Sequence, residues 1–148
     1  MSQLEIYCVT NKKIPQLEKS KYKLAAVGTR EFTDIYLTCD GGDNIFNKEK
    51  YYSELTFHYW YWKNLYALNS KNWIGFCQRR RFFIKPESIV SEININNLNK
   101  YIVTEPEKDW ENYNSIICSP ISVSGAKKIK LLKRGWKNIV KNPLIFFN

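Results

Sequence analysis

The chain has 148 residues, of which 44% are hydrophobic and 16% aromatic, and it carries a formal net charge of +9. This length supports one domain with a core, and this apolar content excludes an intrinsically disordered chain. The sequence contains no run of about 18 uncharged apolar residues, and no basic region precedes an apolar stretch near its start. We therefore expect no membrane span, no signal peptide and a cytoplasmic protein.

The basic charge comes mostly from lysine, with 18 Lys against five Arg. Asn and Ile are also abundant, a bias typical of AT-rich codon usage, so the net charge alone does not indicate a nucleic-acid or membrane partner. Three of the five arginines stand together at Arg79, Arg80 and Arg81. Codon usage explains that clustering less well, which makes it a candidate anion-binding site.

The four cysteines form no Cys-x-x-Cys pair, and the single histidine, His58, is not at metal-ligand spacing from any of them. We therefore expect no metal site. Cys8, Cys77 and Cys118 lie within apolar, strand-like runs and are expected to be buried free thiols.

Short apolar runs bounded by turn-forming residues indicate strands. The expected strands comprise residues 4–10, 22–27, 35–39, 73–77, 101–104 and 115–118. Because these runs alternate with helical segments, the sequence predicts an α/β layer fold. Residues 40–44 are a dense cluster of Asp, Gly and Asn, which predicts a tightly shaped loop.

One long helix is predicted over residues 51–68, where apolar residues recur at spacings of three and four. The face predicted to be buried consists of Tyr52, Leu55, Tyr59, Trp62 and Tyr66. Glu54, His58 and Tyr61 fall on another face. Glu54 lies in the first turns, where the helix dipole favours a carboxylate.

Residues 126–141 combine seven Lys or Arg side chains with apolar residues at helical spacing, interrupted once by Gly135. This basic amphipathic pattern has two interpretations. The segment is a helix packed on the domain with a solvated lysine face, or it is a helix that lies on an anionic membrane surface.

Four segments, in the same order, resemble a bacterial family of capsular-polysaccharide glycosyltransferases that has long been catalogued as a domain of unknown function. They are Thr10-Asn11-Lys12, Gly42-Asp43-Asn44-Ile45, residues 51–64 and residues 73–83. The resemblance implies an α/β fold with a GT-A-like, Rossmann-type nucleotide-sugar-binding domain, which we place at residues 1–125, before a basic segment at 126–148. It also implies transfer of a sugar from a nucleotide-diphosphate donor to a cell-surface or capsular glycan. The expected acceptors include lipid-linked glycans at the inner face of the membrane.

This sequence departs from the family's pattern at two places. The family's histidine after the first strand is Asn11 here, and its Cys-His-Tyr-Arg-Arg run is Cys77-Gln78-Arg79-Arg80-Arg81. Members of the family also continue beyond the matched region. We therefore expect a domain shortened at its C-terminus.

The donor-binding residues are expected where strands end, because ligands of open α/β sheets lie outside the carboxyl ends of the strands. The sequence has no Asp-x-Asp motif, which holds a divalent metal on the diphosphate in many GT-A enzymes. Guanidinium groups can neutralise phosphate oxygens directly, so we expect no cofactor and no metal requirement. In an extended segment only Arg79 and Arg81, or only Arg80, would face one side. The residues assigned to the nucleotide sugar are Thr10, Asn11, Lys12, Asn44, Gln78, Arg79, Arg80 and Arg81.

Sugar transfer with inversion needs a group that deprotonates the acceptor hydroxyl. Asp43 is the first candidate, because it lies in a glycine-rich loop of a matched segment, and Glu54 is the second. Each also has a structural interpretation. Asp43 suits an Asx-turn that shapes the loop, and Glu54 suits a solvated first turn of a helix.

Two alternatives to an active transferase remain open at the level of the sequence. A nucleic-acid-binding module would use the arginine cluster on phosphates and the nearby aromatic residues on bases. That interpretation leaves the acidic residues Asp43 and Glu54 unexplained. The other alternative is a non-catalytic remnant of a glycosyltransferase that retains only the fold or donor binding.

Overall fold

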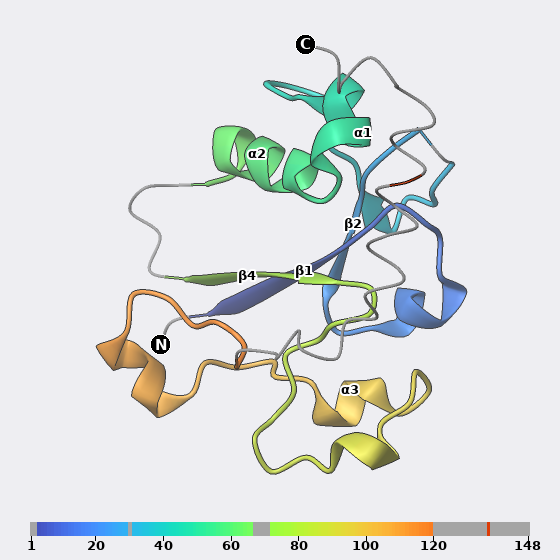
Figure 1. Cartoon of the computed structure of the whole chain (residues 1–148). Helices are drawn as coiled ribbons and strands as arrows, with labels where there is room; N and C mark the ends of the chain where they lie inside the picture. The colour runs from blue at the N-terminus through green and yellow to red at the C-terminus, as the bar shows by residue number, and fades with distance from the viewer. Residues whose placement is uncertain (1–2, 30, 67–71, 120–135, 137–148) are drawn as a thin grey trace. The chain divides into compact units, whose positions relative to one another are not determined.

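The computed structural model describes residues 3–29, 31–66, 72–119 and 136 (Figure 1). The chain divides into two compact units, Met1–Ile116 and Ile117–Asn148. The sheet and all of the labelled helices lie in the first unit.

Four parallel strands form one sheet in the order β3-β2-β1-β4. They are β1 (Leu4–Thr10), β2 (Lys23–Ala26), β3 (Tyr36–Leu37) and β4 (Trp73–Gln78). The strands predicted at residues 4–10, 22–27 and 73–77 are confirmed, and the one predicted at 35–39 is reduced to two residues. The fold is therefore α/β, as expected, and it is compatible with a Rossmann-like arrangement.

β1 is the central strand of the core because both of its faces are buried. Ile6 and Cys8 belong to the core cluster on one face of the sheet, and Tyr7 and Val9 belong to the cluster on the other. This alternation follows from the two-residue period of a strand. A strand covered on both faces consists of consecutive apolar residues, which is the pattern that predicted β1.

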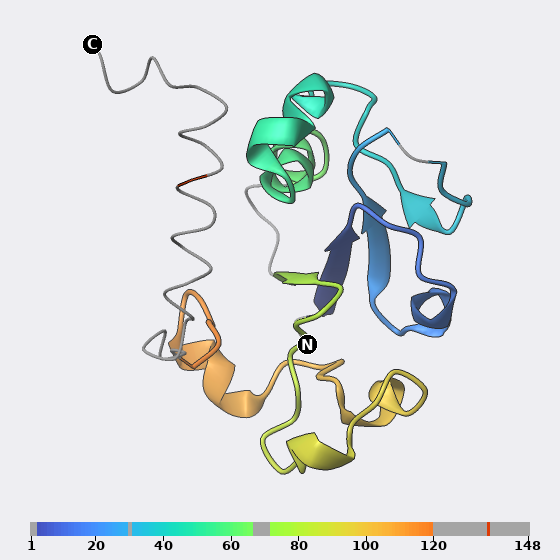
Figure 2. The same cartoon turned by 45° about the vertical axis from the view of Figure 1, so that its right-hand side comes forward.

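The labelled helices are α1 (Glu49–Tyr52), α2 (Leu55–Asn64) and α3 (Leu98–Tyr101). α1 and α2 lie over one face of the sheet, and α3 lies over the other (Figure 1, Figure 2). Phe57, Trp60 and Tyr61 join the core beneath α2, and Leu98 of α3 joins the opposite core. Single 3-10 turns occupy Pro15–Lys19, Phe46–Lys48, Val90–Glu92 and Lys108–Asn112.

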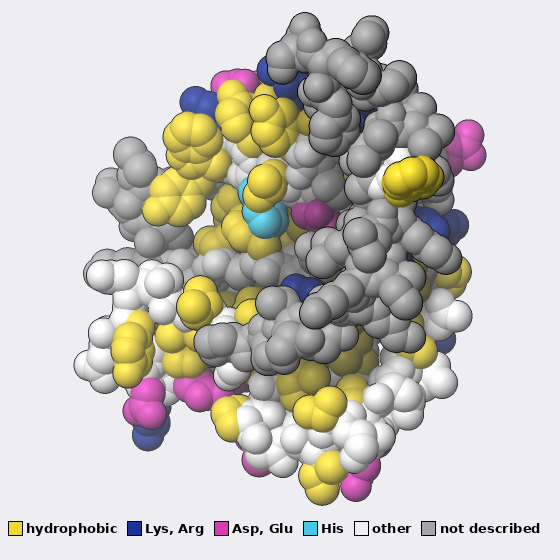
Figure 3. All heavy atoms as spheres, viewed as in Figure 1, with side chains coloured by type: hydrophobic (Ala, Val, Ile, Leu, Met, Phe, Trp, Pro, Cys, Tyr) yellow, Lys and Arg dark blue, Asp and Glu magenta, His cyan; other side chains and the backbone are white. Residues whose placement is uncertain are grey.

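The prediction of one helix over residues 51–68 is wrong in its continuity and in its buried face. Ser53 has a φ of 49°, which separates α1 from α2. Four side chains of the face expected to be buried are instead 47% to 57% exposed, namely Tyr52, Leu55, Trp62 and Tyr66. Hydrophobic side chains are visible over these helices in Figure 3. The segment is apolar on nearly every side, so its periodicity does not select one face.

Two of the short strands expected near the end of the first unit do not form. Residues 115–118 have no regular structure, and residues 101–104 keep a single antiparallel bridge between Ile102 and Ile84. Cys118 is exposed rather than buried, whereas Cys8 and Cys77 are buried as expected. A four-residue apolar run has too few positions to distinguish a strand from an extended connection.

The basic segment at residues 126–141 lies outside the described residues except for Trp136, and so does the predicted domain boundary at residue 125. Among the helices that the structure describes, none is long and apolar enough to cross a lipid bilayer.

The burial of three thiols predicts one reactive cysteine. A hydrogen bond with Cys8 and burial raise the pKa of the Cys77 thiol, and burial raises the pKa of Cys39 to about 11. Neither group forms much reactive thiolate near neutral pH. We expect a maleimide to label only Cys118 rapidly in the folded protein and the other three cysteines only after denaturation, as read by mass spectrometry.

A Cys118→Ser variant supplies the control. It should lose the rapid labelling of the folded protein and keep the labelling of the other three cysteines after denaturation. Rapid labelling of two or more cysteines in the folded wild-type protein would contradict the burial pattern.

Candidate functional site

The loops that carry most of the predicted donor-binding residues begin where the strand order reverses. β2 lies on one side of β1 and β4 lies on the other, so the reversal falls between β1 and β4. The parallel register aligns Val9 with Gln78, so the segments that follow these two residues begin at neighbouring strand ends. Open parallel sheets bind ligands at such a reversal, outside the carboxyl ends of the strands.

The loop after β1 is shaped by Thr10, whose side chain is buried. The Thr10 hydroxyl accepts a hydrogen bond from the Lys12 backbone N–H at 3.0 Å and donates one to the Lys12 carbonyl at 2.8 Å. The hydroxyl therefore already has both a donor and an acceptor partner. Thr10 closes the turn, and the exposed residues Asn11 and Lys12 are the ones that the turn presents to solvent.

The tribasic turn, residues 78–81, follows β4. The Arg81 backbone N–H donates a hydrogen bond to the Gln78 carbonyl at 2.9 Å, which closes the turn. The expectation that only Arg79 and Arg81, or only Arg80, face one side assumed an extended segment, and that assumption is wrong because the chain turns here. Arg79 is half-buried, and Arg80 and Arg81 are exposed. Within the described residues none of their guanidinium groups forms an ion pair or side-chain hydrogen bond, so all three can receive an anion.

A hollow of about 330 Å³ lies beyond the carboxyl ends of β2 and β3. Phe32 and Phe46 supply apolar walls, and Thr29, Thr38 and Asp40 supply polar groups. Its volume is at the lower end of the range of about 300–1,000 Å³ that is usual for small-molecule sites. Together with the two loops at β1 and β4, the hollow extends the candidate site across the carboxyl end of the sheet.

Glu49 of α1 is a residue of this region that the sequence analysis did not identify. Gly28, just after β2, has a φ of 87°, and a Cβ built there would lie 3.5 Å from the carboxyl carbon of Glu49. The carboxylate therefore lies directly against the end of β2. The available sequence signal was Gly28 itself, because a glycine just after a strand marks a positive φ or a close approach.

Glu54 directly precedes α2 and is half-buried. One turn later, the His58 ring packs on the Phe76 ring, with 4.3 Å between centroids. Phe76 lies near the middle of β4, two residues before Gln78, so this contact places the first turn of α2 over the middle of the sheet. Burial lowers the pKa of His58, and the negative charge of Glu54 opposes that shift.

Asp43 lies in a different place from Glu54. The Tyr59 hydroxyl donates to Asp43 Oδ1 at 3.0 Å, and Asn64 Nδ2 donates to the Asp43 carbonyl at 2.8 Å. The first bond fixes the Asp43 carboxylate to Tyr59, which follows Glu54 by about 7.5 Å of helix at 1.5 Å per residue, and the second fixes the Asp43 backbone to the end of α2. No described hydrogen bond joins the two candidate carboxylates, and no described hydrogen bond or ion pair joins either one to the tribasic turn.

Asn44 is engaged inside its own loop. Its Nδ2 donates to the carbonyls of Asp40 and Gly42 at 3.0 and 2.9 Å, and its Oδ1 accepts from the Phe46 backbone N–H at 3.1 Å. The structure therefore gives Asn44 a loop-shaping position. The tight loop predicted at residues 40–44 is confirmed.

His58 generates a prediction about pH. Its folded pKa lies below its ordinary value of 6.5, so the unfolded chain binds the proton more readily. The free energy of unfolding should be fully retained above pH 6.5 and fall as the pH drops below it. Urea unfolding between about pH 7.5 and about pH 5.5 measures this effect.

The matched variant is His58→Phe, which keeps a ring against Phe76 but cannot titrate. It should show a smaller loss of stability over the same pH interval. An identical pH dependence in the wild type and the variant would show that other groups control it.

Comparison with protein families places the chain among proteins whose role has not been assigned. A family model described as a domain of unknown function, DUF4422, matches residues 5–138. Neither the curated proteins nor the solved structures contain a match to the chain. Because the family model covers most of its length, the chain belongs to the DUF4422 family.

Proposed function

With membership of this family as the premise, we propose that the chain is a GT-A-like donor-binding domain of a glycosyltransferase. It would transfer a sugar from a nucleotide-diphosphate donor to a cell-surface or capsular glycan. The observation that carries the proposal is the adjacent ending of β1 and β4, which starts both the loop with the exposed Asn11 and Lys12 and the tribasic turn at the strand-order reversal. A diphosphate suits that position, because cationic residues follow both of these strand ends.

The reaction itself requires positive charge at this position. When the bond between the sugar and the diphosphate breaks, negative charge develops on the leaving oxygen, and groups aimed at that charge lower the barrier. Arg79, Arg80 and Arg81 have no ion-pair partner among the described residues, so their charge is not already neutralised there. We assign the stabilisation of the leaving group to these side chains, without a divalent metal.

The nucleoside of the donor is assigned to the hollow beyond β2 and β3. Phe32 and Phe46 offer apolar surface to a base, and Thr29 and Thr38 offer hydrogen bonds. The Glu49 carboxylate against the end of β2 suits the hydroxyls of a ribose, because acidic residues near this strand bind ribose in dinucleotide-binding folds.

Glu54 is the proposed general base for the acceptor hydroxyl. No described hydrogen bond or ion pair engages its carboxylate, and it directly precedes the turn of α2 whose His58 packs on β4, whereas the Asp43 carboxylate accepts a hydrogen bond from Tyr59. A base must reach the proton that it removes, so position decides between two carboxylates of similar chemistry.

The acceptor of the proposed reaction is a glycan or a lipid-linked glycan on the cytoplasmic side of a membrane. An anionic membrane surface is the proposed partner of residues 126–141, where each Lys or Arg near the surface would contribute about 1 kcal/mol. The positive charge in that segment supports this part of the proposal.

The proposed site predicts donor binding without a metal ion. We expect calorimetric titration with a panel of nucleoside diphosphates and nucleotide sugars to give the same Kd for at least one ligand in excess EDTA and in Mn²⁺. Arg79→Ala should raise the Kd of that ligand by at least about tenfold, which corresponds to a loss of about 1.4 kcal/mol of binding free energy.

Lys108→Ala, at an exposed residue outside the site, is the charge-matched control and should leave the Kd unchanged. Loss of all binding in EDTA would overturn the metal-free assignment. Binding of single-stranded nucleic acid without any nucleotide-sugar binding would instead support the nucleic-acid alternative.

A further prediction distinguishes the roles of the Glu54 and Asp43 carboxylates. Glu54→Gln should lower the release of nucleoside diphosphate from the donor by about 10²- to 10⁴-fold, the usual contribution of a general base. Donor Kd and melting temperature should change little. Asp43→Asn keeps an oxygen that accepts from Tyr59, so it should remain active to within a few-fold. A large loss of turnover in Asp43→Asn alone would reverse the assignment.

A further inference from the structure

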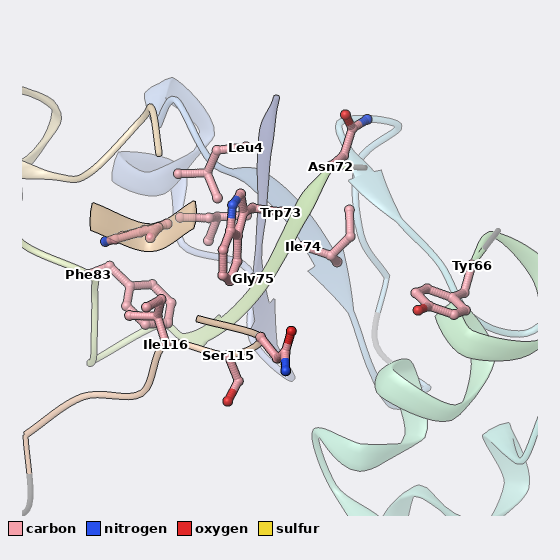
Figure 4. A pocket seen from close by; sticks show the side chains of 12 residues that line it. Leu4, Tyr66, Asn72, Trp73, Ile74, Gly75, Phe83, Ser115 and Ile116 are labelled. Atoms are coloured by element: carbon pink, nitrogen blue, oxygen red, sulfur yellow. The ribbon is translucent and has the colours of Figure 1, made fainter. Parts of the chain in front are cut away.

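A second pocket lies at the opposite end of the sheet from the proposed donor site. Its volume is about 280 Å³, and it is formed where the amino ends of β1 and β4 meet the segment at residues 110–116. Figure 4 shows Leu4, Trp73, Phe83 and Ile116 gathered on one side of β4, and Tyr66 on the other. These residues come from five places in the chain, and only Trp73 and Phe83 belong to the same segment identified in the sequence.

Gly75 keeps the floor of this pocket open. It lies in the middle of β4, opposite Ile6, and a Cβ built there would lie 3.0 Å from Ile6 Cγ1. A strand interior disfavours glycine, so a glycine at such a position marks a close approach of other atoms. Here it leaves bare backbone between aromatic walls on an edge strand of the described sheet.

The walls combine aromatic rings with uncharged polar groups. Trp73 and Trp110 pack edge to face, with 5.3 Å between ring centroids and 69° between ring planes, and both are only partly buried. Asn114 and Ser115 are exposed at the rim, and their side chains form no hydrogen bond with any other described residue. Among the described residues that line this pocket, none carries a charge.

We propose that this pocket binds a neutral oligosaccharide. The C–H face of a pyranose packs on an indole ring, and its hydroxyls both donate and accept hydrogen bonds. The amide of Asn114 and the hydroxyl of Ser115 do the same. The inference goes beyond the proposed transfer reaction and would hold if the chain transferred no sugar. In a transferase it would hold a distal part of the glycan, at the other end of the sheet from the donor site.

The chemistry of the lining argues against other small ligands. A nucleotide or another polyanion needs cationic side chains, and the described lining residues include none. An entirely apolar ligand would leave the rim amide and hydroxyl without a use. A sugar matches the lining because each ring offers both an apolar face and several hydroxyls.

Indole N–H signals in two-dimensional NMR test the proposal directly. We expect at least one of maltotriose, cellotriose and chitotriose, titrated to about 10 mM against Kd values of about 1 mM, to shift the Trp73 and Trp110 signals saturably. Trp60 and Trp62 on α2 should not shift. Trp110→Ala should weaken binding by about tenfold, since a lost ring contact removes about 1–1.5 kcal/mol.

Three variants complete the design. Asn114→Ala removes an exposed amide that forms no hydrogen bond with any other described residue, so it should weaken trisaccharide binding several-fold without unfolding the chain. Trp62→Ala removes an exposed indole from α2 and should leave the Kd unchanged. Arg79→Ala should also leave it unchanged, which separates this pocket from the donor site.

The proposal is overturned if none of the three trisaccharides shifts the two indole signals, or if Trp110→Ala and Trp62→Ala weaken binding equally. It is also overturned if benzyl alcohol shifts these signals while the sugars do not, because the pocket would then be a purely apolar contact site. Loss of trisaccharide binding in Trp110→Ala with nucleotide-sugar binding intact supports two separate sites. Failure of nucleotide sugars to bind anywhere would affect only the proposed transfer reaction.

Discussion

The packing of Tyr7 against α2 and β4 is the contact on which the rest of the first unit depends. The Tyr7 ring lies 5.5 Å from Phe57, 5.1 Å from Tyr61 and 6.1 Å from Phe76, centroid to centroid. Pairs of this kind contribute about 0.5–1.5 kcal/mol each beyond the area that they bury. They join β1 to β4 and to α2, and so hold α2 in place over these two strands. Because Glu54 immediately precedes that helix, the aromatic cluster also positions the proposed base.

The same helix organises the loop after β3. The Trp60 indole N–H donates a hydrogen bond to the Gly41 carbonyl at 2.7 Å. The Asn64 side chain accepts a hydrogen bond from the Asp43 backbone N–H and donates one to the Asp43 carbonyl. One side of α2 is thus used for the core, and another for holding a polar loop. The remaining aromatic side chains of α1 and α2 stay exposed, with Lys63 Nζ 4.1 Å from the Trp62 ring centroid. This division explains how a segment apolar on all sides can lie at the surface of the fold.

The two ends of the sheet present different chemistry to solvent. At the carboxyl ends, Lys12 and the tribasic turn supply positive charge, and the nearby carboxylates remain separate from it. At the amino ends, Trp73 and Trp110 form the walls of a pocket whose described lining residues carry no charge. A parallel sheet produces this polarity because all of its strand ends of one kind emerge together. An anionic donor and a neutral glycan would therefore be recognised about one strand length apart, by different physical interactions.

The sequence by itself determined the three longer strands β1, β2 and β4, because double burial requires continuous apolar runs, and it predicted a site at their carboxyl ends, because parallel strands end together. It placed residues 10–12 and 78–81 at those ends and indicated the loop at residues 40–44. Tertiary structure alone decided which face of α2 is buried, because Phe57, Trp60 and Tyr61 form as good an apolar stripe as the exposed residues do. It also decided that Asp43 and Glu54 lie apart and that Trp73 meets Trp110. Such contacts join residues distant in the chain, and local periodicity carries no information about which distant surfaces meet.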